Sequence, residues 1–170
     1  MLPWGLVYSF CNYFFMLLTC PMTEEIYEGL GALELGNFHK AEEHFGKVLQ
    51  SQGSEKCLDI HEFIEAHNGM GAVEFSHRDL MEARRWYHEA KYLLNDMYKD
   101  KWPAKLSWKN VDDRPAMRNL MGHAHVHYAG GDLKKAREYY EMLLTHDKKD
   151  EIGAQRYLDG VKKGIHFDEI

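Results

Sequence analysis

The stretch 131–136, Gly-Asp-Leu-Lys-Lys-Ala, followed by Tyr140, decides the fold of this chain. Gly131 and Asp132 predict a turn and an N-cap, because glycine accepts turn conformations and an aspartate side chain accepts a backbone N–H at the start of a helix. Ala136 and Tyr140 are four residues apart and therefore share one face of the helix that follows. The stretch predicts an amphipathic helix with a small residue at a close-contact point.

The same pattern occurs twice earlier in the chain. Residues 36–41 read Gly-Asn-Phe-His-Lys-Ala and are followed by Phe45, and residues 78–83 read Arg-Asp-Leu-Met-Glu-Ala and are followed by Tyr87. A second helical stretch precedes each turn, with a small residue that lets two antiparallel helices approach closely: Gly29, Gly71 and Ala124. The copies predict three helical hairpins, at about 22–50, 58–94 and 115–147.

A hairpin whose second helix carries Ala-x₃-aromatic resembles the tetratricopeptide repeat, with its pattern W-x₂-L-G-x₂-Y, then A-x₃-F, then P. The second half of the motif matches in every copy. The first half keeps glycine at Gly29 and Gly71 but lacks the tryptophan and the tyrosine. The resemblance implies an all-α, right-handed superhelix of about three hairpins over 22–164, covered by a capping helix at 151–163. Residues 165–170 are then a tail.

The connection between the second and third hairpins is the longest. It contains Trp102 and Trp108 and ends with Asp112 and Asp113 before Pro115. Proline is favoured in the first turn of a helix, so a new helix is expected to begin there. The connection is therefore predicted to be an ordered excursion that packs its aromatic residues.

Composition favours one globular domain. The chain has 170 residues, of which 28% are charged, and a formal net charge of −6 without a basic stripe. This charge argues against nucleic acid as the main partner. The three cysteines, Cys11, Cys20 and Cys57, have neither the pattern of a disulfide framework nor a metal-binding spacing. No cofactor is expected.

Residues 1–21 are apolar and contain no Lys, Arg, Asp or Glu. Their length is close to the ~20 residues of a membrane-spanning helix. Three interpretations stay open: a mis-called start with Met22 as the true beginning, an N-terminal anchor, or a cleaved signal. The first gives a cytoplasmic protein, and the second a membrane-anchored one. Only an anchor would bring the chain to a membrane.

The histidine cluster His123, His125 and His127 is the sharpest chemical candidate. On a helix His123 and His127 lie four residues apart on one face, a spacing that offers two nitrogen ligands to zinc. The same positions are packing positions of the repeat, so buried histidines without a metal are the main expectation. No catalytic residue is identified, and the chain is expected not to be an enzyme.

The resemblance implies a groove lined by the first helix of each hairpin. The lining carried over residue by residue includes Leu33, Glu65, Asn68, Phe75, Arg118, Met121, His125 and Tyr128. The expected function is a non-catalytic adaptor that binds a protein or peptide in this groove. Two alternatives are a metal-binding protein or enzyme that uses the histidine cluster, and a self-associating scaffold or homo-oligomer.

Overall fold

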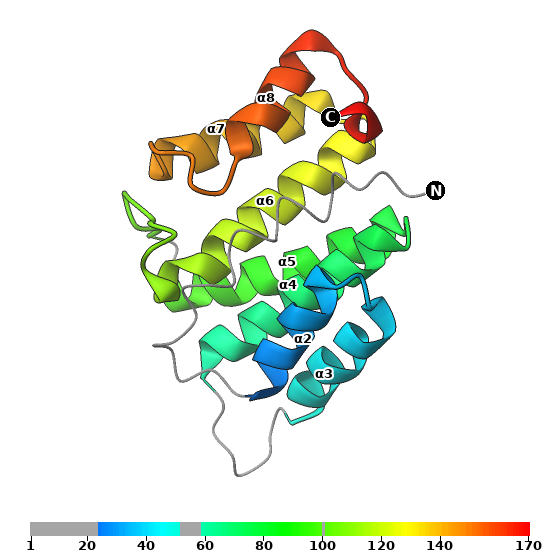
Figure 1. The fold of residues 1–170 in the computed structure, drawn as a ribbon. Helices are drawn as coiled ribbons and strands as arrows, with labels where there is room; N and C mark the ends of the chain where they lie inside the picture. Colours follow the sequence, from blue (N-terminus) through cyan, green and yellow to red (C-terminus); the bar gives the residue numbers. More distant parts are fainter. Residues whose placement is uncertain (1–23, 52–58, 100) are drawn as a thin grey trace. The chain divides into compact units, whose positions relative to one another are not determined.

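The computed structural model describes residues 24–51, 59–99 and 101–170, which form helices and no strand (Figure 1). Seven α-helices follow one another: α2 (Glu24–Glu34), α3 (Phe38–Gln50), α4 (Ile60–Ser76), α5 (Leu80–Tyr98), α6 (Arg114–Ala129), α7 (Leu133–His146) and α8 (Ala154–Lys163). Two short 3₁₀ helices complete the described elements: η2 (Val111–Asp113) and η3 (Phe167–Glu169). The prediction of an all-α protein is confirmed.

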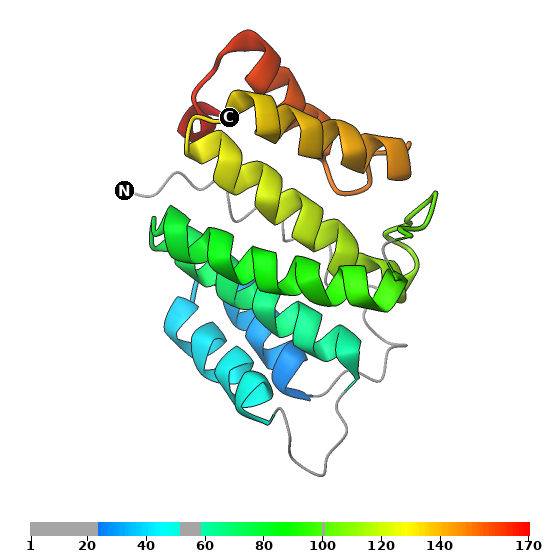
Figure 2. The ribbon, with the colours of Figure 1, turned by 180° about the vertical axis from the view of Figure 1, so that it is seen from behind.

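The chain divides into two compact units, with the boundary between Leu93 and Leu94 inside α5. In the first unit α3 packs against both α2 and α4, and Figure 2 shows α4 beside α5. In the second unit α6 packs against α7, α7 packs against α8, and η2 and η3 contact α6. Consecutive helices thus form the packed pairs that the repeated stretches predict.

Each hairpin turn has the same backbone geometry. The residue before the cap has a positive φ in all three turns: 70° at Gly36, 66° at Arg78 and 79° at Gly131. The next residue accepts a hydrogen bond from the backbone N–H three positions later: Asn37 from Lys40 (3.2 Å), Asp79 from Glu82 (2.9 Å) and Asp132 from Lys135 (3.2 Å). The predicted turns and N-caps are confirmed.

Arg78 holds a side chain at the left-handed backbone position that glycine occupies in the other two turns. A non-glycine residue in that region costs about 1–2 kcal/mol, and glycine's larger loss of backbone freedom on folding offsets part of the gain. We expect Arg78→Gly to raise the free energy of unfolding by about 0.5–1 kcal/mol in urea denaturation. The reverse change in the first turn, Gly36→Arg, should lower it. A destabilised Arg78→Gly protein would contradict this reasoning.

The core of the first unit is organised around Phe45 of α3, whose side chain is fully buried. A Cβ atom built at Gly29 of α2 would lie 2.6 Å from the Phe45 ring, and one at Gly69 of α4 would overlap the ring. The ring therefore lies between glycines of two different helices. In the next pair a Cβ atom at Gly71 would lie 2.9 Å from Tyr87. The close approaches predicted at Gly29 and Gly71 are confirmed, and Gly69 adds one that the sequence did not identify.

The core of the second unit is formed by α6, α7 and α8. Helix α7 buries one face through Ala136, Tyr140 and Leu143. Helix α8 packs against α7, and the apolar residues at this end of the chain are buried: Ile152, Tyr157, Leu158 and Val161. This burial agrees with the capping role that the sequence suggests for this helix.

The connection that precedes α6 is ordered over 101–113. The Trp102 Nε1–H donates to Asn95 Oδ1 at 2.7 Å. Trp108 is almost fully buried, and its backbone carbonyl accepts a hydrogen bond of 2.8 Å from Arg114 Nε. Pro115 lies in the first turn of α6, as predicted. The excursion thus fixes its tryptophans and leads directly into the third hairpin.

No helix among the described residues is long and apolar enough to cross a membrane. The apolar leader, 1–21, lies outside the described residues.

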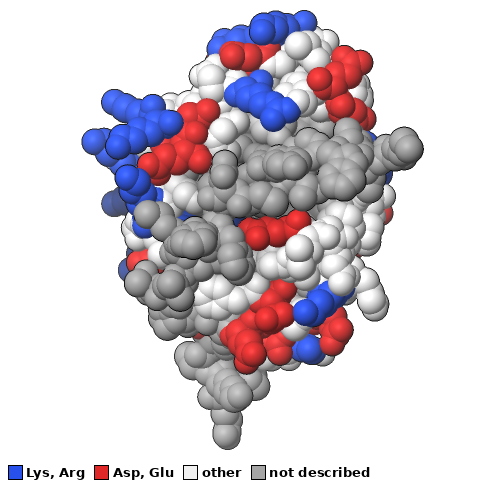
Figure 3. All heavy atoms as spheres, in the orientation of Figure 1, with Lys and Arg blue, Asp and Glu red and all other residues white. Residues whose placement is uncertain are grey.

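Figure 3 shows acidic and basic side chains interspersed on the surface of α2 and α3. Two ion pairs account for part of this mixture: Lys40–Glu28 at 3.0 Å and Lys47–Glu43 at 3.1 Å.

Candidate functional site

Helix α4 of the first unit carries three of the predicted groove residues on one face. Glu65, Asn68 and Phe75 are spaced by three and seven positions on a continuous helix, so their side chains project from the same side. All three are buried. Glu62, one turn before Glu65, is also buried and extends this polar row. Glu62 is not among the predicted groove residues, although its spacing of three from Glu65 places it on the same face of α4.

Leu33 of α2 is the other predicted groove residue in the first unit. Its side chain is partly buried and packs against the hydrophobic core of that unit. This core consists of Ile26, Ala32, Ala41, Phe45, Val48, Ala66, Met70 and Val73. Leu33 therefore contributes to packing in the structure, and its role in binding stays a prediction.

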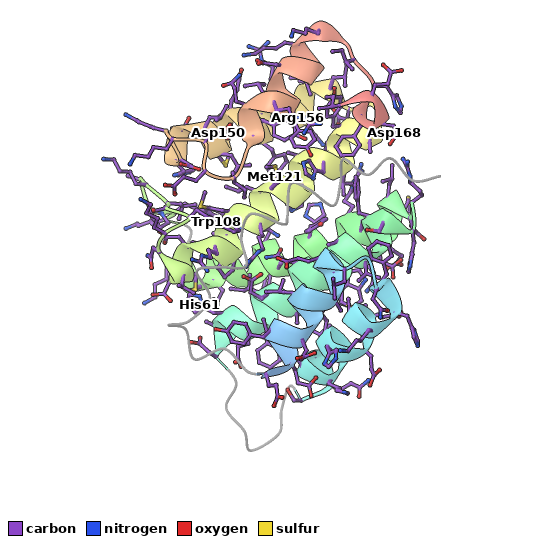
Figure 4. The ribbon with its side chains drawn as sticks, viewed as in Figure 1. His61, Trp108, Met121, Asp150, Arg156 and Asp168 are labelled. Carbon is purple, nitrogen blue, oxygen red and sulfur yellow. The ribbon has the colours of Figure 1, made fainter. Side chains whose placement is uncertain are left out.

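Helix α6 of the second unit carries the remaining four predicted residues. Arg118, Met121, His125 and Tyr128 are spaced by three, four and three positions and share one face of the helix, where Figure 4 labels Met121. Met121, His125 and Tyr128 are buried, and Arg118 is partly exposed. The Arg118 guanidinium lies 5.0 Å from the centre of the Trp108 ring, a cation–π distance that orients its side chain.

Three aromatic rings surround His125. The His125 ring centre lies 4.5 Å from that of Tyr157 on α8, 5.2 Å from Phe167 in η3 and 6.0 Å from Tyr140 on α7. Tyr157 also stacks on Tyr140 at 5.9 Å and on Phe167 at 5.8 Å. We call His125, Tyr128, Tyr140, Tyr157 and Phe167 the aromatic cluster. It joins one end of the predicted binding face to α7, α8 and η3.

The 165–170 segment packs against this face of α6. The Tyr128 hydroxyl donates to the backbone carbonyl of Ile165 at 2.5 Å, and the Tyr128 ring meets Phe167 edge-on at 5.4 Å. Ile170 lies against Gly160 of α8, where an added Cβ atom would overlap its side chain. This segment is therefore packed on the second unit, whereas the sequence predicts only a tail for it. Three bulky apolar residues in six, Ile165, Phe167 and Ile170, were the signal that it packs.

Burial lowers the pKa of His125 to about 3 from its ordinary 6.5. The imidazole is therefore neutral in the folded protein, whereas in the unfolded chain it takes up a proton below pH 6.5. The folded state binds fewer protons, so stability is lost as pH falls from about 6.5 toward 3, by about 1.4 kcal/mol per pH unit. Above pH 6.5 this group contributes no pH dependence.

We expect His125→Leu to remove this contribution. Between pH 7.5 and 5.5 the wild-type protein should lose about 1.4 kcal/mol more than the variant. Urea denaturation of both proteins at the two pH values measures the difference. Parallel pH dependences for the two proteins would contradict a neutral, buried His125.

His123 and His127 both stack on the ring of Tyr139, which is not a member of the aromatic cluster. The ring centres are 5.0 Å and 5.7 Å apart, and the planes are nearly parallel. His127 Nδ1 also lies 3.3 Å from Asp132 Oδ2. Within the described ranges no group of three His, Cys, Asp or Glu side chains is arranged to hold a metal ion. The contacts of His123 and His127 are thus ring stacking on Tyr139 and, for His127, a polar contact with Asp132.

Among the described residues five large apolar side chains are exposed outside the predicted groove: Leu133 and Met142 in the second unit and three in the first. Leu35 is 86% exposed at the end of α2, and Met81 and Tyr92 of α5 are 84% and 72% exposed. Leu35, Met81 and Tyr92 lie at separate places in the first unit, and none of them is a residue of the predicted groove. They provide matched surface positions for testing where a partner binds.

Comparisons with known proteins identify no relative of this chain. No family model, curated protein or solved structure matches the chain. A functional proposal for this chain therefore depends on the contacts within its two units and on the resemblance of its repeated stretches.

Proposed function

We propose that this chain is a non-catalytic protein-binding module of the tetratricopeptide type. In this proposal three hairpins, α2 with α3, α4 with α5 and α6 with α7, form a right-handed superhelix that α8 covers at one end. The first helices of the hairpins, α4 and α6 above all, present the binding residues. The partner is a segment of another protein.

One observation carries the proposal: the predicted binding face of α6 holds a peptide segment in the structure. His125 and Tyr128 were selected from the sequence as groove residues, and both contact the 165–170 segment. Tyr128 donates to a backbone carbonyl, which is an interaction that any peptide can offer. The His125 ring contacts an aromatic side chain, Phe167, which is an interaction that selects among peptides.

The packing of the hairpins gives independent support. Phe45 and Tyr87 lie on the second helices and pack against glycines of the first helices, Gly29 and Gly71. The three turns share one backbone geometry and one capping scheme. A protein built from such repeated pairs is suited to display residues from successive helices to a partner.

Substitution of Arg118 tests whether a partner binds to the α6 face. Arg118 is a partly exposed arginine on this face, and arginine is enriched among residues that dominate binding energy. A partner would be identified by chemical cross-linking to the full chain and then titrated as a purified protein. We expect Arg118→Ala to weaken its binding at least about tenfold.

Arg137→Ala on α7 is the matched control, because Arg137 is exposed and pairs with Glu141 on its own helix at 2.8 Å. Its binding should stay within about twofold of the wild type. Thermal unfolding of both variants checks that each is folded. Unchanged binding by Arg118→Ala, together with loss of binding by Met81→Ser or Tyr92→Ser, would place the partner on α5 and reject the proposed face.

A further inference from the structure

The 165–170 segment is joined to α8 through a turn at Gly164. Gly164 has a φ of 66° and follows the last residue of α8, so the chain changes direction there. Beyond the turn the segment forms its own backbone hydrogen bonds, from Glu169 N to His166 O at 3.0 Å and from Ile170 N to Phe167 O at 3.4 Å. These two bonds lie within the segment, whereas its first residue is tied to α8, because Ile165 N donates to Gly160 O at 3.0 Å.

The segment meets α6 and α8 through the backbone of Ile165, the Phe167 ring and the Ile170 side chain. The Ile165 carbonyl accepts from Tyr128, the Phe167 ring enters the aromatic cluster, and the Ile170 side chain lies over Gly160. These contacts use the backbone of one residue, one aromatic ring and one aliphatic side chain. A short segment of another protein with the same three features would make the same contacts.

The receiving surface is suited to such a ligand. Burial and the nearby Glu169 carboxylate raise the pKa of Tyr128, so its hydroxyl keeps its proton and remains a donor. Gly160 has no side chain, which leaves room for Ile170. With the segment removed, the faces of His125, Tyr128 and Tyr157 that now contact Phe167 would lose that cover.

We propose that the 165–170 segment is a displaceable internal ligand, and that the surface beneath it binds a partner segment of the same chemistry. The partner segment carries an aromatic residue two positions after the carbonyl that faces Tyr128, then acidic residues, then an aliphatic residue that fills the space over Gly160. Binding of the partner and docking of the internal segment exclude each other. This inference rests on the proposed function, since it names the form in which a partner segment binds.

A labelled synthetic peptide of sequence Gly-Ile-His-Phe-Asp-Glu-Ile, which is residues 164–170, tests the exchange. It is titrated by fluorescence anisotropy into the full wild-type chain and into full-length Phe167→Ala, in which the internal segment lacks its aromatic anchor. We expect the Phe167→Ala chain to bind the peptide at least about tenfold more tightly than the wild type, because the competing internal ligand is weakened.

Two control variants locate the bound peptide. A peptide with Phe167→Ala should bind the Phe167→Ala chain at least about tenfold more weakly than the natural peptide. Adding Tyr128→Phe to that chain should also weaken binding of the natural peptide, because the ring is kept and only the donor is lost. Circular dichroism confirms that each chain is folded. If Phe167→Ala does not fold, Ile170→Ala replaces it, and at least about threefold tighter binding than the wild type is expected.

Equal peptide binding by the wild-type chain and the weakened chain would overturn the proposal, as would binding that does not need the peptide's phenylalanine. A wild-type dimer that the peptide converts to monomers in light scattering would also overturn it, since the occupant would then be a second copy. The titration needs no partner protein. Its failure therefore rejects the exchange alone, whereas unchanged partner binding by Arg118→Ala, together with loss of binding in the α5 variants, rejects the α6 face of the proposed function.

Discussion

Gly69→Ala is expected to lower the free energy of unfolding by about 2–3 kcal/mol, although alanine is the better helix former. The added Cβ atom would overlap the ring of Phe45. That ring cannot move away toward α2, because Gly29 is already in close contact with its opposite edge. The overlap must therefore be relieved by a shift of α3 or α4. Urea denaturation measures the loss.

Gly46→Ala is the matched control for this substitution. Gly46 follows Phe45 on the same helix, α3, and an added Cβ atom would meet no neighbour within 4 Å. It should stabilise the protein by up to about 1 kcal/mol through helix propensity alone. The double variant Gly69→Ala with Phe45→Leu should recover part of the loss, since the smaller side chain leaves the ring's space free. A fully additive double variant would contradict direct contact.

Tyr157→Ala is expected to cost about 3–5 kcal/mol, the largest single loss on the second unit. Tyr157 contacts three members of the aromatic cluster, His125, Tyr140 and Phe167, and only 4% of its surface is exposed. Truncation leaves a cavity between α6, α7, α8 and η3. Thermal and urea unfolding measure the loss.

Tyr157→Phe and Tyr92→Ala separate the causes of this effect. Tyr157→Phe keeps the ring stacking and should stay within about 1 kcal/mol of the wild type. Tyr92→Ala removes an equally large ring from an exposed position and should change stability by less than about 0.5 kcal/mol. If Tyr157→Ala were no more destabilising than Tyr92→Ala, the cluster would not hold the second unit together.

The helices were predictable because their signals are local. The Gly-Asn, Arg-Asp and Gly-Asp pairs supply the turn conformation and the cap of each hairpin within a few residues. The Ala-x₃-aromatic spacing places one face of each second helix against the first helix. Both signals depend on backbone geometry and helical periodicity, which the residues determine without knowledge of the rest of the chain.

The contacts between successive pairs were not predictable in the same way. Gly69 contacts Phe45 only because α4 packs against α3. No spacing in the sequence predicts which glycine the Phe45 ring will contact. The docking of Phe167 on His125 joins residues that are far apart in the chain. The sequence selected His125 and Tyr128 as binding residues, but it could not show that a neighbouring segment occupies them.

Hydrogen–deuterium exchange of the full wild-type chain, with and without its cross-linked and purified partner, tests the central claim most directly. Binding of a partner segment on α6 should slow exchange in Arg114–Ala129 and accelerate it in the 165–170 segment, where Glu169 and Ile170 donate internal hydrogen bonds. Slower exchange confined to α5 or α7, with the 165–170 segment unchanged, would contradict the claim that the α6 face is the binding surface.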